Sequence, residues 1–136
     1  MTPQELCALA QQALKNAYAP YSGCKVGAAL LTKNGRVFTG CNVENAAFGP
    51  TVCAERVALF KAVSEGCLEF TALAVAGGKG GVQAGAYPPC GVCRQVLAEF
   101  CVPSFKIYLS AGRKEPLCYT LGELLPAAFC AKLHGR

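Results

Sequence analysis

The sequence is poor in several residue types, and these shortages exclude several classes of protein. It contains no tryptophan, a single histidine (His134) and only 15% charged residues. No apolar run approaches the roughly 20 residues that a membrane-spanning helix needs. The amino terminus, Met1 to Glu5, lacks the basic start and apolar core of a secretory signal. We therefore expect a soluble cytoplasmic protein with no membrane partner.

Clustered positive charge is also missing. The 13 lysines and arginines outnumber the 8 aspartates and glutamates and give a net charge of +5, but they are scattered along the chain with no run of three. Proteins that bind nucleic acids concentrate basic residues on one face and often add a series of stacking aromatics. Neither pattern is present, so we expect no nucleic-acid partner.

What the sequence does have is apolar residues and cysteines. With 136 residues, 53% of them hydrophobic, the chain can bury a real core, and we expect one domain over residues 1–136. Ten cysteines are present. In a reducing cytosol they point to metal binding, catalysis or apolar packing rather than to disulfides. We expect most of them to pack as small buried residues.

The pattern of apolar residues predicts alternating helices and strands. Helices are expected over about residues 3–17, 53–64, 91–100 and 121–125, and strands over about 25–31, 36–41, 70–76, 106–110 and 117–120. Thr2 to Glu5 has the form of a capping box, and Asn34-Gly35 predicts a hairpin turn. The glycine-rich stretch 77–87 is expected to be a flexible surface loop. This order predicts an α/β domain with helices packed on a mixed sheet.

Two short fragments carry the chemistry: Cys53-Ala54-Glu55 and Pro89-Cys90-Gly91-Val92-Cys93. Two thiolates spaced Cys-x-x-Cys and a third from elsewhere can hold a tetrahedral zinc ion with one position open to water, which is the catalytic arrangement. A structural zinc needs a fourth ligand. His134 lies near the end of the chain, but one of the other seven cysteines could still close the site.

The residues beside these cysteines fit a catalytic zinc site. Three thiolates around Zn²⁺ leave a formal charge of −1, which two helix N-termini would offset. Arg56, and less strongly Arg94, could donate hydrogen bonds to the sulfurs. Glu55, two residues after Cys53, is placed to act as a general base and then a general acid. A glutamate that merely favours a helix N-terminus is the alternative, and the cysteine pattern outweighs it.

The pattern Cys-x-Glu followed by Pro-Cys-x-x-Cys is a signature of zinc deaminases. Over nearly its whole length the chain resembles the short, homotetrameric type of cytidine deaminase. The resemblance is carried by Tyr18-Ala19-Pro20-Tyr21-Ser22, Val26-Gly27-Ala28-Ala29-Leu30-Leu31, Gly40-Cys41-Asn42-Val43-Glu44-Asn45-Ala46, Cys53-Ala54-Glu55-Arg56, Lys61-Ala62-Val63-Ser64-Glu65-Gly66, Pro89-Cys90-Gly91-Val92-Cys93-Arg94-Gln95-Val96 and Glu123-Leu124-Leu125-Pro126.

The resemblance implies a three-layer α-β-α domain with a mixed five-stranded sheet, one Zn²⁺ per chain and a homotetramer. It implies hydrolytic deamination of cytidine and deoxycytidine to uridine and deoxyuridine, with release of ammonia, in pyrimidine salvage. Cys53, Cys90 and Cys93 would bind zinc, and Glu55 would move protons. Asn42 and Glu44 would bind the ribose 3′-hydroxyl, the backbone of Ala54 would contact the pyrimidine, and Phe129 would stack on the base, often from a neighbouring subunit.

Some features depart from the family, and other functions stay open. Where the family commonly has Phe, this chain has Cys24, so one wall of the pocket is expected to be smaller or differently filled. A nucleoside antibiotic or a base in a polynucleotide is an alternative substrate. A zinc module with four protein ligands, or a thiol redox protein that uses Cys90 and Cys93, is an alternative class.

Overall fold

The computed structural model describes residues 1–131, and its centre is one mixed sheet of five strands in the order β2-β1-β3-β4-β5. Only the pairing of β3 with β4 is parallel; β1 pairs antiparallel with both β2 and β3, and β4 with β5. The expected mixed five-stranded sheet is therefore confirmed. The strands are β1 (Cys24–Thr32), β2 (Val37–Cys41), β3 (Phe70–Lys79), β4 (Lys106–Ser110) and β5 (Leu117–Thr120).

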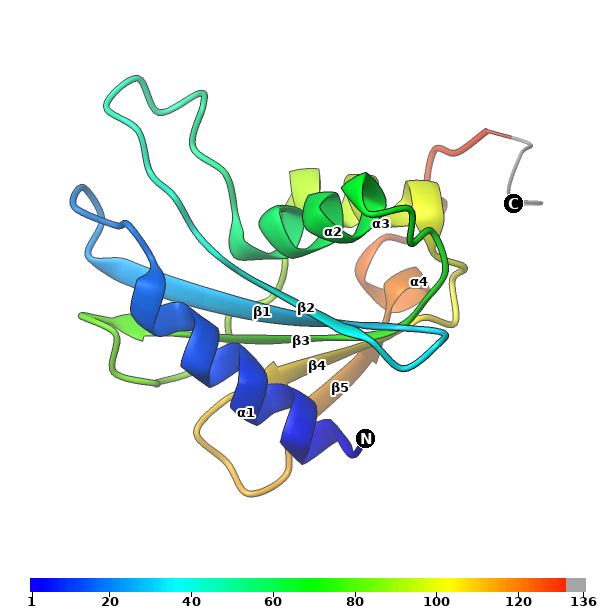
Figure 1. Cartoon of the computed structure of the whole chain (residues 1–136), viewed down its shortest axis with the longest axis horizontal. Coiled ribbons are helices and arrows are strands. Elements are labelled where there is room, and N and C mark those ends of the chain that lie inside the picture. The colour runs from blue at the N-terminus through cyan, green and yellow to red at the C-terminus, as the bar shows by residue number, and fades with distance from the viewer. Residues whose placement is uncertain (132–136) are drawn as a thin grey trace.

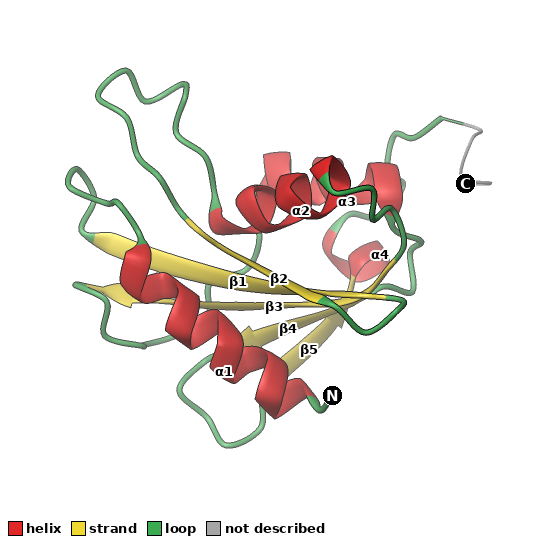
Figure 2. Ribbon diagram, in the orientation of Figure 1, coloured by secondary structure: helices red, strands yellow, loops and turns green. Residues whose placement is uncertain are grey.

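Helices cover both faces of this sheet (Figures 1 and 2). Helix α1 (Pro3–Ala13) lies on one face, and α2 (Ala54–Ser64), α3 (Gly91–Phe100) and the short α4 (Leu121–Leu124) lie on the other. Alternate residues of the central strands belong to two separate apolar cores. In β3, for example, Leu73 and Val75 pack toward α2 and α3, whereas Ala74 packs toward α1. The three-layer α-β-α arrangement is confirmed.

Small residues bring α1 very close to the sheet. A Cβ atom on Gly27 of β1 would lie 2.0 Å from the carbonyl oxygen of Ala10, so only glycine fits there. Thr2 Oγ1 accepts a hydrogen bond from the backbone N–H of Glu5, at 3.1 Å, as the N-cap of α1. The helix ends at Ala13, four residues earlier than expected, and continues as a 3₁₀ turn over Leu14–Asn16. The hairpin between β1 and β2 forms as predicted, with Gly35 at φ +88°.

The prediction of a surface loop over 77–87 was wrong for its first part. Gly77, Gly78 and Lys79 extend β3 and pair with the start of β1, where Cys24 lies opposite Lys79. Gly77 and Gly78 are buried. The chain then folds back so tightly that a Cβ on Gly78 would lie 1.6 Å from the carbonyl oxygen of Val82. These glycines therefore permit close backbone packing at the end of a strand.

None of the helices within residues 1–131 is both long enough and apolar enough to cross a membrane.

Candidate active site

Two helices begin close to one another, and each begins at a cysteine. Cys53 is the N-cap residue of α2, and Cys90 is the N-cap residue of α3. Cys93 lies one turn into α3 and is fully buried. The backbone of α2 rests directly on β2, because a Cβ on Gly40 would lie 2.5 Å from the carbonyl oxygen of Ala54. Glycine at that position therefore fixes where α2 starts.

The three cysteine sulfurs form one compact group. Their Sγ atoms all lie within 4.8 Å of one another, and those of Cys53 and Cys90 are 3.7 Å apart. Sulfurs on a tetrahedral zinc ion, each about 2.3 Å from the metal, lie about 3.8 Å apart. Thiolates also suit zinc chemically, so this set fits a zinc ion with three protein ligands.

Within residues 1–131, no fourth histidine, cysteine or acidic residue joins this group, and it is the one group of its kind there. All ten cysteines are free. His134 lies outside the described residues. A closed zinc module with a fourth cysteine ligand therefore finds no support in the described part of the chain. A dithiol redox site made of Cys90 and Cys93 alone leaves the position of Cys53 unexplained.

Hydrogen bonds to its sulfur favour the thiolate form of Cys53. Hydrogen bonding to the thiol of Cys93, and after it the Arg56 guanidinium, lowers the pKa of Cys53 to about 5, although burial opposes this. Arg56 Nη2 donates to Cys53 Sγ at 3.4 Å. Its Nε is buried and has no hydrogen-bond partner among residues 1–131, so the guanidinium retains an unused donor. The pKa of Cys93 is raised, because it shares its proton with Cys53 and is buried.

Arg94 has a different position from the one considered in the sequence. Its Nε donates to the carbonyl oxygen of Pro89 at 2.7 Å, and its Nη1 donates to the carbonyl oxygen of Leu124 at 2.7 Å. It therefore connects the segment before Cys90 with the end of α4 instead of contacting the sulfurs.

Glu55 lies in the first turn of α2 and is only 5% exposed. Burial, which disfavours the charged form, raises its pKa to about 7, and the negative charge of Cys53 adds to this shift. A carboxyl group with a pKa near neutrality can both accept and donate a proton under physiological conditions. Glu55 is therefore suited to acid–base chemistry beside the sulfurs.

A cavity of about 160 Å³ opens onto Glu55 and two of the sulfurs. Its walls combine apolar side chains with a few polar groups, as is usual for small-molecule sites. It is lined by Val26, Asn42, Thr51, Val52, Cys53, Ala54, Glu55, Tyr87, Pro88 and Cys90. The structure thus brings Asn42, Ala54 and Glu55 together with the sulfur group.

The two expected sugar-binding residues lie in neighbouring hollows. Asn42 lines the sulfur cavity. Its Oδ1 accepts a hydrogen bond from Val26 N at 2.8 Å, and its Nδ2 donates one to Cys24 O at 2.9 Å, so the backbone fixes this side chain. Glu44 lines an adjacent hollow of about 410 Å³ and accepts hydrogen bonds from the N–H groups of Tyr21 and Ser22. Thr51 lines both hollows.

Phe129 does not line the sulfur cavity of its own chain. The residue is 84% exposed, and its carbonyl oxygen accepts a hydrogen bond from Gln95 Nε2 at 2.8 Å. Tyr87, by contrast, lines the cavity and was missed in the sequence. The available signal was an aromatic residue only three positions before Cys90.

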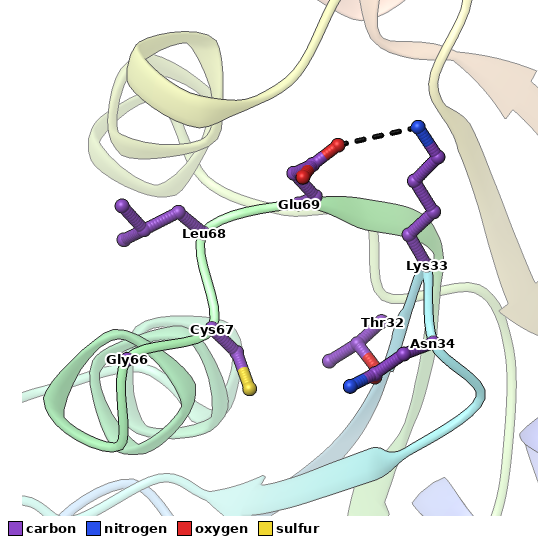
Figure 3. A pocket seen from close by; sticks show the side chains of 7 residues that line it. All are labelled: Thr32, Lys33, Asn34, Gly66, Cys67, Leu68 and Glu69. Carbon is purple, nitrogen blue, oxygen red and sulfur yellow. Dashed lines mark hydrogen bonds and ion pairs between the residues drawn. The ribbon is translucent and has the colours of Figure 1, made fainter.

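A hollow of about 430 Å³ lies beside the turn between β1 and β2, at the other end of these strands from Cys24 and Cys41. Figure 3 shows Lys33 and Glu69 joined at its side, where Nζ and Oε2 are 3.3 Å apart. Thr32 Oγ1 donates a hydrogen bond to Asn34 Oδ1. The polar side chains of this hollow therefore already pair with one another. No cluster of three or more possible metal ligands lies among the described residues of this hollow.

Comparisons with known proteins agree with this geometry. Residues 1–109 match the family model described as the cytidine and deoxycytidylate deaminase zinc-binding region. The cytidine deaminase of Halalkalibacterium halodurans is 50% identical over 97% of both chains, and that of Sporosarcina psychrophila is 46% identical over 95% of this chain and 92% of its own.

Solved structures give the same result. The crystal structure of a cytidine deaminase from Burkholderia pseudomallei is 46% identical, has a TM-score of 0.86 and aligns with 95% of this chain and all of its own. The enzyme from Mycobacterium tuberculosis is 42% identical, with a TM-score of 0.80 and coverage of 95% of this chain and 98% of its own. The cofactor of the matched region is zinc, and the sulfurs of Cys53, Cys90 and Cys93 are positioned to bind one ion.

Proposed function

The chain belongs to the cytidine and deoxycytidylate deaminase family, and from that premise we propose that it hydrolyses cytidine and deoxycytidine to uridine and deoxyuridine, releasing ammonia. The observation that carries the proposal is the cavity in which Glu55 faces the same space as the sulfurs of Cys53 and Cys90. A general acid–base and a metal site open to one small cavity are what hydrolysis of an amidine C–N bond requires.

Cys53, Cys90 and Cys93 hold one Zn²⁺ per chain in this proposal. When bound, the ion supplies a Lewis acid that lowers the pKa of water from about 16 to about 7 in favourable sites. Arg56 balances part of the negative charge of three thiolates, since its Nη2 lies 3.4 Å from Cys53 Sγ. The two helix N-termini that begin at Cys53 and Cys90 add partial positive charge.

Glu55 carries the protons. It accepts one from the attacking water and delivers it to N3 of the pyrimidine ring, which makes C4 more electrophilic. It then takes the second proton from the hydroxyl added at C4 and passes it to the amino group, which leaves as the C4–N bond breaks and the C4 carbonyl forms, so that one water is consumed and one ammonia is released. A pKa raised to about 7 by burial supports this double role, because the group changes protonation state near neutral pH.

Asn42, Glu44 and Ala54 position the nucleoside. Ala54 is the first residue of α2, so its backbone N–H has no partner within the helix and is available to the pyrimidine. The fixed amide of Asn42 and the carboxylate of Glu44 are suited to a sugar hydroxyl. Thr51 lines both hollows, which supports the binding of one ligand that extends across both.

We also propose a homotetramer in which Phe129 reaches the base bound by a neighbouring subunit. Large contiguous patches of exposed apolar side chains mark interaction surfaces. Phe129 is 84% exposed, and on the loop that projects between β2 and α2 (Figure 1) Phe48 is 70% exposed and packs edge-on against Tyr21. Light scattering after gel filtration tests the tetramer. A monomer that is fully active would contradict this role of Phe129.

Domain organisation and cellular role complete the proposed function. Residues 1–136 form one domain, which is supported by strands drawn from residues 24 to 120 in a single sheet. The reaction serves pyrimidine salvage in the cytoplasm, since its substrates are free nucleosides.

The test is direct. Purified protein is incubated with cytidine while ammonia release, loss of cytidine absorbance and zinc per chain are measured. We expect activity together with about one zinc per chain, and in Glu55→Ala we expect zinc to be retained while turnover falls by at least 10²-fold. Near-normal turnover in Glu55→Ala would exclude the assigned role, and no turnover in the wild type would exclude the function.

A further inference from the structure

One wall of the sulfur cavity is an aromatic ring, that of Tyr87, which comes from the loop after β3. Its ring is seated directly over Gly77, because a Cβ on Gly77 would lie 2.7 Å from Tyr87 Cγ, 2.9 Å from Cδ1 and 3.0 Å from Cδ2. Only glycine at position 77 leaves room for the ring. The position of the ring is thus set by β3, a central strand, and not by the loop alone.

The ring lies where the cavity meets the start of β1. Gly77 pairs with Val26, which also lines the cavity, and Cys24 lies two residues earlier on β1. Burial raises the pKa of the Tyr87 phenol, and so does the neighbouring thiol of Cys24. The phenol end of Tyr87 thus lies near the thiol of Cys24 at the start of β1.

Tyr87 is partly buried, packs against the apolar core and still lines the cavity. The backbone on its C-terminal side is held independently, since Arg94 binds the carbonyl oxygen of Pro89. A flat ring fixed in this way offers a rigid apolar wall to a planar ligand, and aromatic pairs prefer offset-stacked or edge-to-face contacts. A preformed wall also costs little conformational entropy when a ligand binds.

We propose that Tyr87 is a specificity-determining residue whose ring contacts the nucleoside in the cavity, with Gly77 as the position that seats it. This inference rests on the proposed deamination and concerns this chain's own pocket wall. Removal of the ring weakens binding of the substrate, the transition state and the product alike, so it raises KM and leaves kcat nearly unchanged.

The first experiment compares Tyr87→Ala, Tyr87→Leu and Tyr87→Phe by kcat, KM for cytidine, zinc per chain and calorimetric binding of uridine, which needs no turnover. We expect a rise of roughly tenfold in KM and in the Kd of uridine for Ala and Leu, with kcat within about threefold. Phe retains the ring and stays within about threefold of the wild type. Tyr87→Leu still fills the apolar volume, so it controls for misfolding caused by lost packing. Tyr119→Ala, which removes an exposed tyrosine of β5, is the matched control and leaves KM unchanged.

The second experiment is a double-mutant cycle with Gly77→Ala. In the wild type the new Cβ displaces the ring, so KM rises several-fold; in Tyr87→Ala no ring remains to be displaced, so Gly77→Ala adds little. An equal rise in both backgrounds would overturn the seating role of Gly77. If Tyr87→Ala and Tyr87→Leu lower only the melting temperature and leave KM and uridine binding unchanged, the ring is merely structural and the proposal fails. An inactive wild type instead overturns the proposed function itself.

Discussion

Cys53 and Cys90 are 37 positions apart and cap two different helices, yet their Sγ atoms lie 3.7 Å apart. This distance is close to the sulfur separation on a tetrahedral zinc ion. It is set by the packing of α2 and α3 on one face of the sheet, with Gly40 beneath the first turn of α2. The metal site is therefore built into the tertiary packing.

Removal of zinc is expected to destabilise the protein. A ligand that binds only the folded state stabilises it by about 4 kcal/mol at a free concentration 1,000 times its Kd. Treatment with a chelator should lower the melting temperature and abolish deamination, and added zinc should restore both. Cys90→Ser should lower zinc per chain, whereas Cys118→Ser, a change at an exposed cysteine of β5, should not. Unchanged zinc content in Cys90→Ser would contradict its assignment as a ligand.

Arg56 is expected to control how firmly zinc is held. Groups that hydrogen-bond metal ligands change metal affinity by about 10- to 100-fold when removed. Arg56→Ala should therefore lose zinc to a competing chelator at a correspondingly lower chelator concentration, and Arg56→Lys should recover part of the difference. Arg113→Ala, at an exposed arginine in the loop before β5, is the charge-matched control. Equal zinc affinity in Arg56→Ala and Arg113→Ala would show that the contact with Cys53 contributes nothing.

The sequence predicted the order of the elements and the sulfur group because both depend on local signals. Cys-x-x-Cys at the start of a helix places two sulfurs together without knowledge of distant contacts. The strands of the sheet were recognisable from their apolar runs. The capping box expected at Thr2 shows only the bond from Glu5 N, whereas the reciprocal pair forms at Thr120 and Glu123, where it had not been predicted.

The features that were missed depend on contacts between distant parts of the chain. Gly77 and Gly78 carry no hydrophobic periodicity, so their place in β3 follows only from pairing with the start of β1. The position of Tyr87 depends on Gly77, and that of Arg94 depends on Leu124, 30 residues away. The roles assigned to Asn42, Glu44, Ala54 and Phe129 stay predictions, although the structure gives the surroundings of each.

Arg94 is expected to hold the zinc-binding segment against α4. It donates to the carbonyl oxygens of Pro89 and Leu124, each at 2.7 Å, and hydrogen bonds that involve a charged group contribute about 1.5–3 kcal/mol. Arg94→Ala should lower the free energy of unfolding by about 2–4 kcal/mol in urea titrations of the zinc-loaded protein. Arg94→Lys should recover part of this loss. A change in Arg94→Ala as small as in the surface variant Arg113→Ala would contradict this linking role.

Glu123 gives the fold a dependence on acidic pH that is separate from the metal site. Its carboxylate accepts a hydrogen bond from Thr120 N at 2.8 Å, and this bond, followed by that from the Thr120 hydroxyl, lowers the pKa of Glu123. Because the pKa is lower in the folded than in the unfolded chain, the stabilisation is complete above the unfolded value and is lost as pH falls through the folded value.

Wild type should therefore be more stable than Glu123→Gln at pH 7, and the difference should shrink as the solution is acidified below the ordinary glutamate range. Glu115→Gln, on an exposed loop where Glu115 accepts a hydrogen bond from Gln4, is the matched control. Urea unfolding at a series of pH values measures the difference, and a constant gap across the series would rule out ionisation of Glu123 as its cause.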